Sequence, residues 1–135
     1  MKHNCTTLIL ACIDFRLIGY INKFIKKKNL ENSCDLLTIA GGARALVRPS
    51  FEYERQAVLG QIKLASKLHS IKEIIFINHE DCGAYGGTKA FNSFKDELIM
   101  HKADMVKAEK FINKKYPKLK VKKFFMKLDG KVTQL

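Results

Sequence analysis

Two short clusters of polar residues in this chain contain the side-chain types that bind zinc. The first reads Cys-Ile-Asp-Phe-Arg over residues 12–16, and the second reads His-Glu-Asp-Cys-Gly over residues 79–83. Thiolate sulfur and imidazole nitrogen are common ligands of a tetrahedral zinc ion. The two-residue gap between His79 and Cys82 lets both side chains reach one ion from a single turn. We therefore expect Cys12, His79 and Cys82 to bind one zinc ion per chain.

The number of available ligands decides what kind of zinc site this is. A structural site normally has four protein ligands, whereas a catalytic site keeps one position open. Cys5 and Cys34 lie near the starts of predicted strands, roughly 20 Å from the cluster at about 3.3 Å per residue. The fourth position is therefore left to water, to substrate or to Asp14. Either cluster alone is a weak signal, because Cys12 would also fit as a small buried apolar residue.

The predicted elements place both clusters at the carboxyl ends of strands. Short apolar runs predict buried strands, and longer amphipathic stretches predict helices. Pro49 and Ser50 precede one of these helices, with Ser50 as its expected cap. We expect strands over residues 6–11, 36–40, 72–78 and 121–128, helices over 17–27, from 50 onward and over 95–115, and a turn at 129–130 before a last strand at 131–135.

Strands that alternate with helices predict an α/β fold with a mainly parallel central sheet flanked by helices. The last strand follows a tight turn and is expected to run antiparallel at one edge. The length of 135 residues fits a single domain over 1–135. In such folds, ligands bind beyond the carboxyl ends of the parallel strands, where the two clusters fall.

The charge and the apolar pattern restrict the partners. The net charge is +12, and lysines are dense between Lys107 and Lys131. A basic surface attracts polyanions, but no nucleic-acid-binding motif accompanies the lysines, so a solvated basic face is the preferred interpretation. No apolar run is long enough to span a membrane, and no signal peptide is recognisable. We expect a cytoplasmic protein whose four cysteines are thiols or metal ligands.

These motifs resemble the signature of the beta-class carbonic anhydrases. Members of that family carry Cys-x-Asp-x-Arg after the first strand and His-x-x-Cys-Gly after the third, which correspond here to residues 12–16 and 79–83. The glycines that follow residue 40 and the turn at 129–130 are similar to further family segments. The resemblance implies zinc ligands at Cys12, His79 and Cys82. It also implies that Asp14 and Arg16 take part in catalysis, with Arg16 holding Asp14 ionised and away from the metal.

The reaction that the resemblance implies is the reversible hydration of carbon dioxide to bicarbonate by a zinc lyase. Zinc lowers the pKa of bound water to near 7, and the resulting hydroxide attacks the carbon of the substrate. A homodimer or larger homo-oligomer is also implied. Phe15 stands in place of the family's usual serine, and Thr38-Ile39 stands in place of Arg-Asn. Because Phe15 would make the site more apolar, hydrolysis of carbon disulfide or carbonyl sulfide is an alternative, as is a zinc-binding protein without catalysis.

A glycine-rich stretch over residues 83–87 is a second candidate feature. Backbone N–H groups of such a stretch bind anions when it leads into a helix, so Gly83 is a candidate for contacting bicarbonate, although a flexible turn fits equally well. Tyr85 and His69 are candidates for proton transfer. His3 and His101 are expected on the surface.

Overall fold

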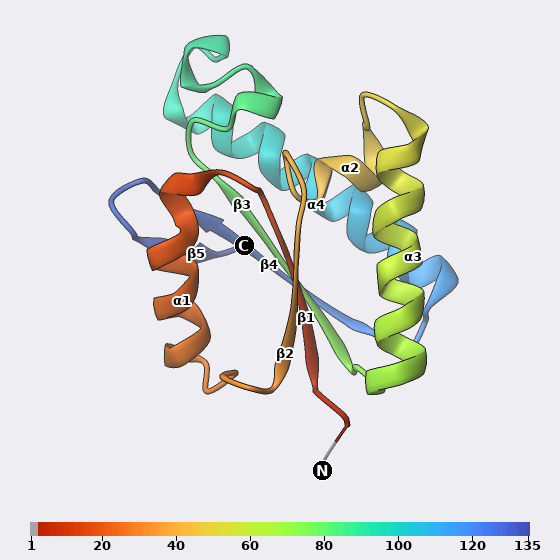
Figure 1. The fold of residues 1–135 in the computed structure, drawn as a ribbon. Helices are drawn as coiled ribbons and strands as arrows, with labels where there is room; N and C mark the ends of the chain where they lie inside the picture. Colours follow the sequence, from red (N-terminus) through yellow and green to blue (C-terminus); the bar gives the residue numbers. More distant parts are fainter. Residues whose placement is uncertain (1–2) are drawn as a thin grey trace.

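A computed structural model describes residues 3–135, which form one α/β domain around a five-stranded sheet (Figure 1). The strand order is β2-β1-β3-β4-β5, with parallel pairing from β2 to β4 and antiparallel pairing of β5 on β4. In chain order the elements are β1 (Thr7–Ala11), α1 (Ile18–Lys27), β2 (Cys34–Thr38), α2 (Arg44–Val47), α3 (Glu52–His69), β3 (Glu73–His79), α4 (Phe94–Lys115), β4 (Lys120–Met126) and β5 (Val132–Gln134).

Helices cover both faces of the sheet, as Figure 1 shows. Helix α1 lies on one face, where Ile21 and Phe24 pack against the strands. Helices α2, α3 and α4 lie on the other face around a larger apolar core. Strand β1, which lies between β2 and β3, is buried along its whole length, and this agrees with its apolar run over residues 8–11. The predicted fold class and the antiparallel edge strand are confirmed.

Register places the carboxyl ends of β1 and β3 side by side. Ala11 pairs with Ile77 of β3 on one side and with Thr38 of β2 on the other. The residues that follow Ala11 and Ile77 therefore meet at one edge of the sheet, the upper edge in Figure 1. This register explains how sequence segments about 70 positions apart contribute to one site.

Two local predictions are wrong. Residues 39 and 40 lie beyond the end of β2, which ends at Thr38 because the chain turns there toward Gly41 and Gly42, both with positive φ. Ser50 does not cap α3, since the N-cap residue is Phe51 and no side chain accepts a capping bond. Instead, the backbone N–H of Ser50 donates to the Glu54 carboxylate at 3.1 Å, which ties the helix start together from inside its first turn.

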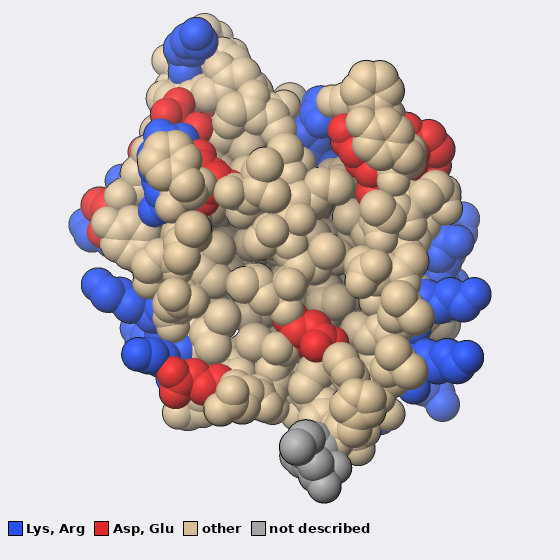
Figure 2. Space-filling view, viewed as in Figure 1, with Lys and Arg blue, Asp and Glu red and all other residues tan. Residues whose placement is uncertain are grey.

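Charge is distributed unevenly over the surface. In Figure 2, Lys and Arg side chains gather along two margins, while the face over β2 between α1 and α3 is largely uncharged. Lysines in the second half of α4, such as Lys107 and Lys114, are exposed, as expected for a solvated basic face. Within residues 3–135, no helix has both the length and the apolar composition needed to cross a bilayer.

Candidate metal centre

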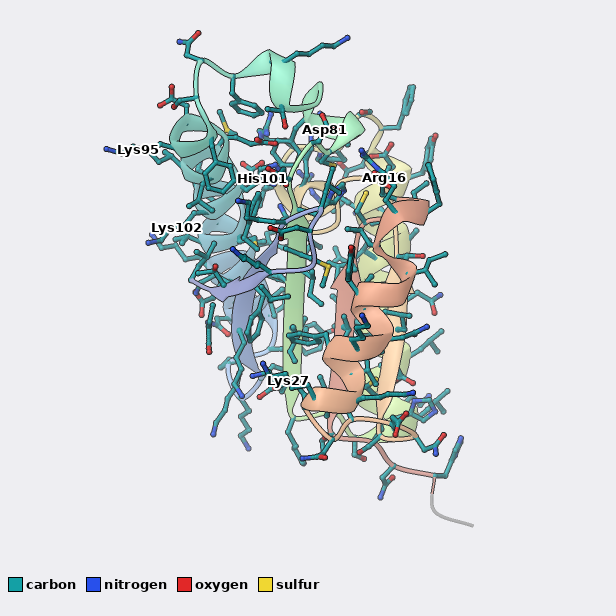
Figure 3. The ribbon with its side chains drawn as sticks, turned by 90° about the vertical axis from the view of Figure 1, so that its left-hand side faces the viewer. Arg16, Lys27, Asp81, Lys95, His101 and Lys102 are labelled. Atoms are coloured by element: carbon teal, nitrogen blue, oxygen red, sulfur yellow. The ribbon has the colours of Figure 1, made fainter. Side chains whose placement is uncertain are left out.

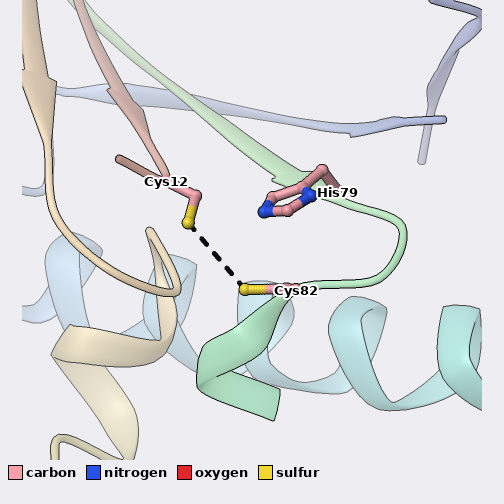
Figure 4. Close-up of side chains that lie close together, drawn as sticks. All are labelled: Cys12, His79 and Cys82. Carbon is pink, nitrogen blue, oxygen red and sulfur yellow. Dashed lines mark hydrogen bonds between the residues drawn. The ribbon is translucent and has the colours of Figure 1, made fainter. Parts of the chain in front are cut away.

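Three buried side chains meet at the carboxyl edge of the sheet. Cys12 follows β1, His79 ends β3, and Cys82 comes three residues later (Figure 4). Their ligand atoms all lie within 4.8 Å of one another, and the two Sγ atoms are 3.9 Å apart. Each residue is at most 6 % exposed. The sequence prediction that these three side chains converge is therefore met by the fold.

The spacing and the chemistry of the three groups fit a zinc ion. Two sulfurs bound tetrahedrally at about 2.3 Å from zinc would lie about 3.8 Å apart, close to the observed separation. The Nδ1 atom of His79 donates to the backbone carbonyl of Glu80 at 2.7 Å, which leaves Nε2 as the free lone pair. Among the described residues, nothing hydrogen-bonds to that buried Nε2 atom. Buried polar atoms normally have a partner, so a buried imidazole nitrogen with none, lying beside two thiols, is suited to bind a metal ion.

The two thiols are electrostatically unequal. The pKa of Cys12 is lowered, chiefly because the Cys82 thiol hydrogen-bonds to its sulfur, and His79 and the Gly41 N–H assist against the opposing effect of burial. The Gly41 N–H lies 3.3 Å from Sγ of Cys12. The pKa of Cys82 is raised, first by its hydrogen bond to Cys12 and then by burial. One thiolate therefore forms readily, and a divalent cation would compensate the charge of both.

Asp14 and Arg16 form an ion pair beside the three donors. Asp14 caps a short 3-10 helix, η1 (Phe15–Leu17), by accepting the Arg16 N–H at 2.9 Å. The Arg16 guanidinium also holds the carboxylate, with contacts of 2.6, 3.0 and 3.2 Å. These bonds lower the pKa of Asp14 to about 2. Its Oδ2 atom lies 3.9 Å from Nε2 of His79, so an ionised carboxylate faces the centre.

Arg16 also connects the two loops of the site, a role that the sequence did not reveal. Its guanidinium donates at 3.0 Å both to the Asp81 carboxylate and to the Asp81 backbone carbonyl. Arg16 and Asp81 lie close together in the side view of Figure 3. Asp81 has a left-handed φ of 59°, and its carboxylate accepts the Thr88 N–H at 2.8 Å. Its own N–H donates to the buried carboxylate of Glu97 at 2.7 Å. The loop before Cys82 is thus fixed by four hydrogen bonds at one residue.

A buried polar network lies behind the centre and corrects the expectation for His101. His101 is fully buried in α4, not exposed, because it lies on the helix face that packs against the sheet. Asn78 donates to its Nδ1 atom at 3.0 Å and to the Tyr85 hydroxyl at 3.2 Å. Tyr85 in turn donates to Asp104 at 2.7 Å, and Arg48 pairs with the same carboxylate. The network braces β3 against α4 next to His79, one of the predicted metal ligands.

The other residues that the sequence analysis singled out are Gly83, Phe15 and His69, and none of them contributes a side chain to the group of three ligands. Gly83 starts the 3-10 helix η2 (Gly83–Tyr85), and a methyl group added at Gly83 would meet nothing. The glycine stretch does not feed a long helix, because the 3-10 helix η3 (Thr88–Ala90) and a turn precede α4. The Phe15 ring is 80 % exposed. His69 lies at the end of α3, at the opposite edge of the sheet from the centre.

Comparison with known proteins gives the class of the chain. Residues 1–135 match the family described as "Putative carbonic anhydrase", and the chain belongs to this family. An uncharacterized protein of Rickettsia conorii is 36 % identical over 136 residues, with 98 % of this chain and 73 % of that protein covered. An uncharacterized protein of Rickettsia bellii is 35 % identical over 136 residues, with 98 % and 83 % covered.

Solved structures show the same fold. A structure from a study of two tetrameric beta-carbonic anhydrases of the ascomycete Sordaria macrospora superposes with a TM-score of 0.67 at 14 % identity, covering 98 % of this chain and 81 % of that one. The beta-carbonic anhydrase CafA of Aspergillus fumigatus gives a TM-score of 0.53 at 17 % identity, with 98 % and 76 % covered. The predicted resemblance to beta-class carbonic anhydrases is therefore confirmed.

Proposed function

We propose that this chain is a zinc-dependent carbonic anhydrase that interconverts carbon dioxide and bicarbonate. One observation carries the proposal: the ligand atoms of Cys12, His79 and Cys82 lie within 4.8 Å of one another, with Asp14 beside them. Membership of the carbonic anhydrase family supports the same reaction. A zinc ion held by these three residues would supply a hydroxide nucleophile at neutral pH, since zinc lowers the pKa of water to near 7.

The chain's own residues orient the reacting groups. Asp14 is ionised at neutral pH and can only accept hydrogen bonds, so it would accept the proton side of a nucleophile held at the centre and would leave a lone pair of that nucleophile free for the substrate. Arg16 donates to the Asp14 Oδ2 atom at 2.6 Å, the same oxygen that lies 3.9 Å from Nε2 of His79, and this ion pair would compete with any binding of Asp14 to the metal as a fourth ligand. The Gly41 N–H stabilises negative charge on the Cys12 sulfur. These groups are set before substrate arrives, which reduces the reorganisation that the reaction requires.

Carbon dioxide is preferred over carbon disulfide or carbonyl sulfide as the substrate. The sulfur-containing alternatives were favoured by Phe15 as an apolar wall of the site. Within one chain this ring is 80 % exposed, so that support is lost. Thr38 and Ile39 supply no arginine where the family has one, and the guanidinium of Arg48, which follows α2, pairs with the Asp104 carboxylate. We therefore expect Asp14 and Arg16 to be the polar side chains that orient the substrate at the centre.

The test compares Cys82→Ala with the control Cys34→Ala, which lies at the opposite edge of the sheet. Purified proteins are assayed for zinc content and for carbon dioxide hydration by stopped flow, with sulfide release from carbon disulfide measured in parallel. Cys82→Ala should lose one equivalent of zinc and all hydration, whereas Cys34→Ala should keep its hydration rate. Asp14→Asn should retain the zinc and lose most of the rate. A zinc-loaded wild type that turns over none of these substrates would contradict the enzymatic proposal.

We also propose that the chain forms a homo-oligomer in the cytoplasm. Large apolar side chains are exposed around the upper part of the β2 face, among them Ile13, Phe15, Phe51 and Tyr53, which are 60 % to 80 % exposed. An exposed apolar surface of this kind is typical of a protein–protein interface. The related Sordaria macrospora enzymes are described as tetrameric. Four free cysteines suit a reducing compartment.

A further inference from the structure

A second group of metal-binding side chains lies at the amino edge of the sheet, the lower edge in Figure 1. Cys5 precedes β1, Asp35 lies in β2, and His69 ends α3. The sulfur, carboxylate oxygen and imidazole nitrogen of these residues lie within 4.8 Å of one another. Cys5 and Cys12 lie at opposite ends of β1, so Cys5 cannot join the first centre. The fold places it in a cluster of its own.

We propose that Cys5, Asp35 and His69 form a second metal site, which binds zinc or another borderline first-row divalent cation. A thiolate, an imidazole and a carboxylate are each ordinary zinc ligands. Together a thiolate and a carboxylate supply two negative charges, which match a divalent ion. Hard cations such as magnesium and calcium prefer oxygen ligands only, so the thiol selects against them. The proposal does not depend on the catalytic function proposed above.

Local contacts show that the three groups already point toward one another. Nδ1 of His69 lies 2.7 Å from Oδ2 of Asp35. The Cys5 sulfur lies near the same carboxylate. Burial raises the pKa of the Cys5 thiol, and the negative charge of Asp35 raises it further. Neither His69 nor Asp35 is fully buried, with side chains 29 % and 30 % exposed. Metal and water therefore have access to the cluster from solvent.

The surroundings leave room for an ion and for a fourth ligand. The cluster lines an open depression of about 290 Å³. The His3 ring stands edge-on to the His69 ring with centroids 5.0 Å apart, so a second imidazole lies next to the three donors. Cys34 borders the same depression, but its side chain packs with the apolar core on the α1 face. Cys5 packs instead with the core on the α3 face.

Metal at this position would join three separate segments. The N-terminal segment already reaches α3 through the Cys5 N–H, which donates to the His69 carbonyl at 3.0 Å. Asp35 adds the start of the edge strand β2 to the same point. A bound cation would therefore link the beginning of the chain, the edge of the sheet and the end of α3, and we expect it to stabilise the fold.

The experiment separates the two sites by mutation. Metal-free, fully reduced protein is titrated with zinc against a chromophoric chelator, and cobalt is used to detect thiolate coordination by near-ultraviolet absorption. Wild type should bind two ions per chain, and Cys12→Ser combined with Cys82→Ser should bind one. Adding Cys5→Ser, or His69→Gln, to that double variant should weaken the remaining equivalent at least tenfold and remove the cobalt–thiolate band. Circular dichroism confirms that each variant is folded.

Cys34→Ser in the same double variant is the matched control and should keep the remaining ion with unchanged affinity. Asp35→Asn tests the carboxylate with little change in shape, and it too should weaken binding. Binding of a single ion by wild type that disappears in the double variant would overturn the proposal. Loss of the second ion in Cys34→Ser but not in Cys5→Ser would overturn the ligand assignment. Neither result depends on whether carbon dioxide is hydrated.

Discussion

The buried imidazole of His101 predicts a specific loss of stability on acidification. His101 has no exposed surface, and burial is the main reason that its pKa is lowered from 6.5 to about 3, with the positive charge of Arg48 also lowering it. Below pH 6.5 the unfolded chain takes up a proton at this position while the folded chain does not. The free energy of unfolding should therefore fall as pH drops from 6.5 toward 3, and this loss should be absent above pH 7.

The magnitude follows from the two pKa values. Between pH 7 and pH 5 the unfolded state gains about 0.7 of a proton at residue 101, and integrating the difference in bound protons over this range gives about 2 kcal/mol of lost stability. The slope is at most about 1.4 kcal/mol per pH unit for one group. A cation bound at the neighbouring centre would also disfavour the protonated form of His101 and so would lower its pKa further.

Urea unfolding of wild type and of His101→Met at pH 7 and pH 5 measures this contribution. Methionine has a similar size and does not titrate, so other groups that change with pH affect both proteins alike and cancel in the comparison. The stability difference between the two proteins should change by about 2 kcal/mol over this range, in the direction that disfavours wild type at pH 5. A difference that is the same at both pH values, or an NMR titration that places the pKa of folded His101 near 6.5, would refute the reasoning.

Two further predictions concern a turn and the assembly state. Gly130 has φ of 91°, and a methyl group there would lie 2.6 Å from the Tyr20 ring, so Gly130→Ala should lower the free energy of unfolding by about 1–3 kcal/mol. Gly19→Ala, where a methyl group meets nothing, should be neutral or slightly stabilising in the same urea titration. Light scattering should give a mass of at least twice the 15.4 kDa of one chain; a monomer at micromolar concentration would contradict the proposed assembly.

The convergence of the metal-binding residues was predictable because it depends on strong signals. The apolar runs of β1 and β3 are strong signals: the first leads directly into Cys12, and the second is separated from His79 only by Asn78. Parallel pairing then leaves little freedom in where the two ends lie. The cap of α3 was harder to predict. The Glu54 carboxylate, which lies inside the helix, accepts the backbone N–H of Ser50, and the side chain of Ser50 does not cap the helix.

The burial of His101 was present in the sequence as a weaker signal. It precedes Met105 by four positions and Ala108 by seven, which places all three on one face of α4. A single polar residue on an apolar stripe is easily assigned to the surface, because a buried imidazole requires partners that only the fold supplies. Here Asn78 from β3 and the ring of Tyr85 provide them. The roles of Gly41 and Asp81 likewise depend on loop geometry that no local pattern specifies.

The left-handed backbone at Asp81 restricts how this protein can drift in sequence. A replacement must tolerate a positive φ, which favours glycine, asparagine and aspartate. Glycine would keep the backbone but lose the acceptor for Thr88, and asparagine would keep the shape but lose the negative charge that meets Arg16. Position 81 therefore admits few neutral changes, although its side chain is partly exposed and is not one of the predicted metal ligands.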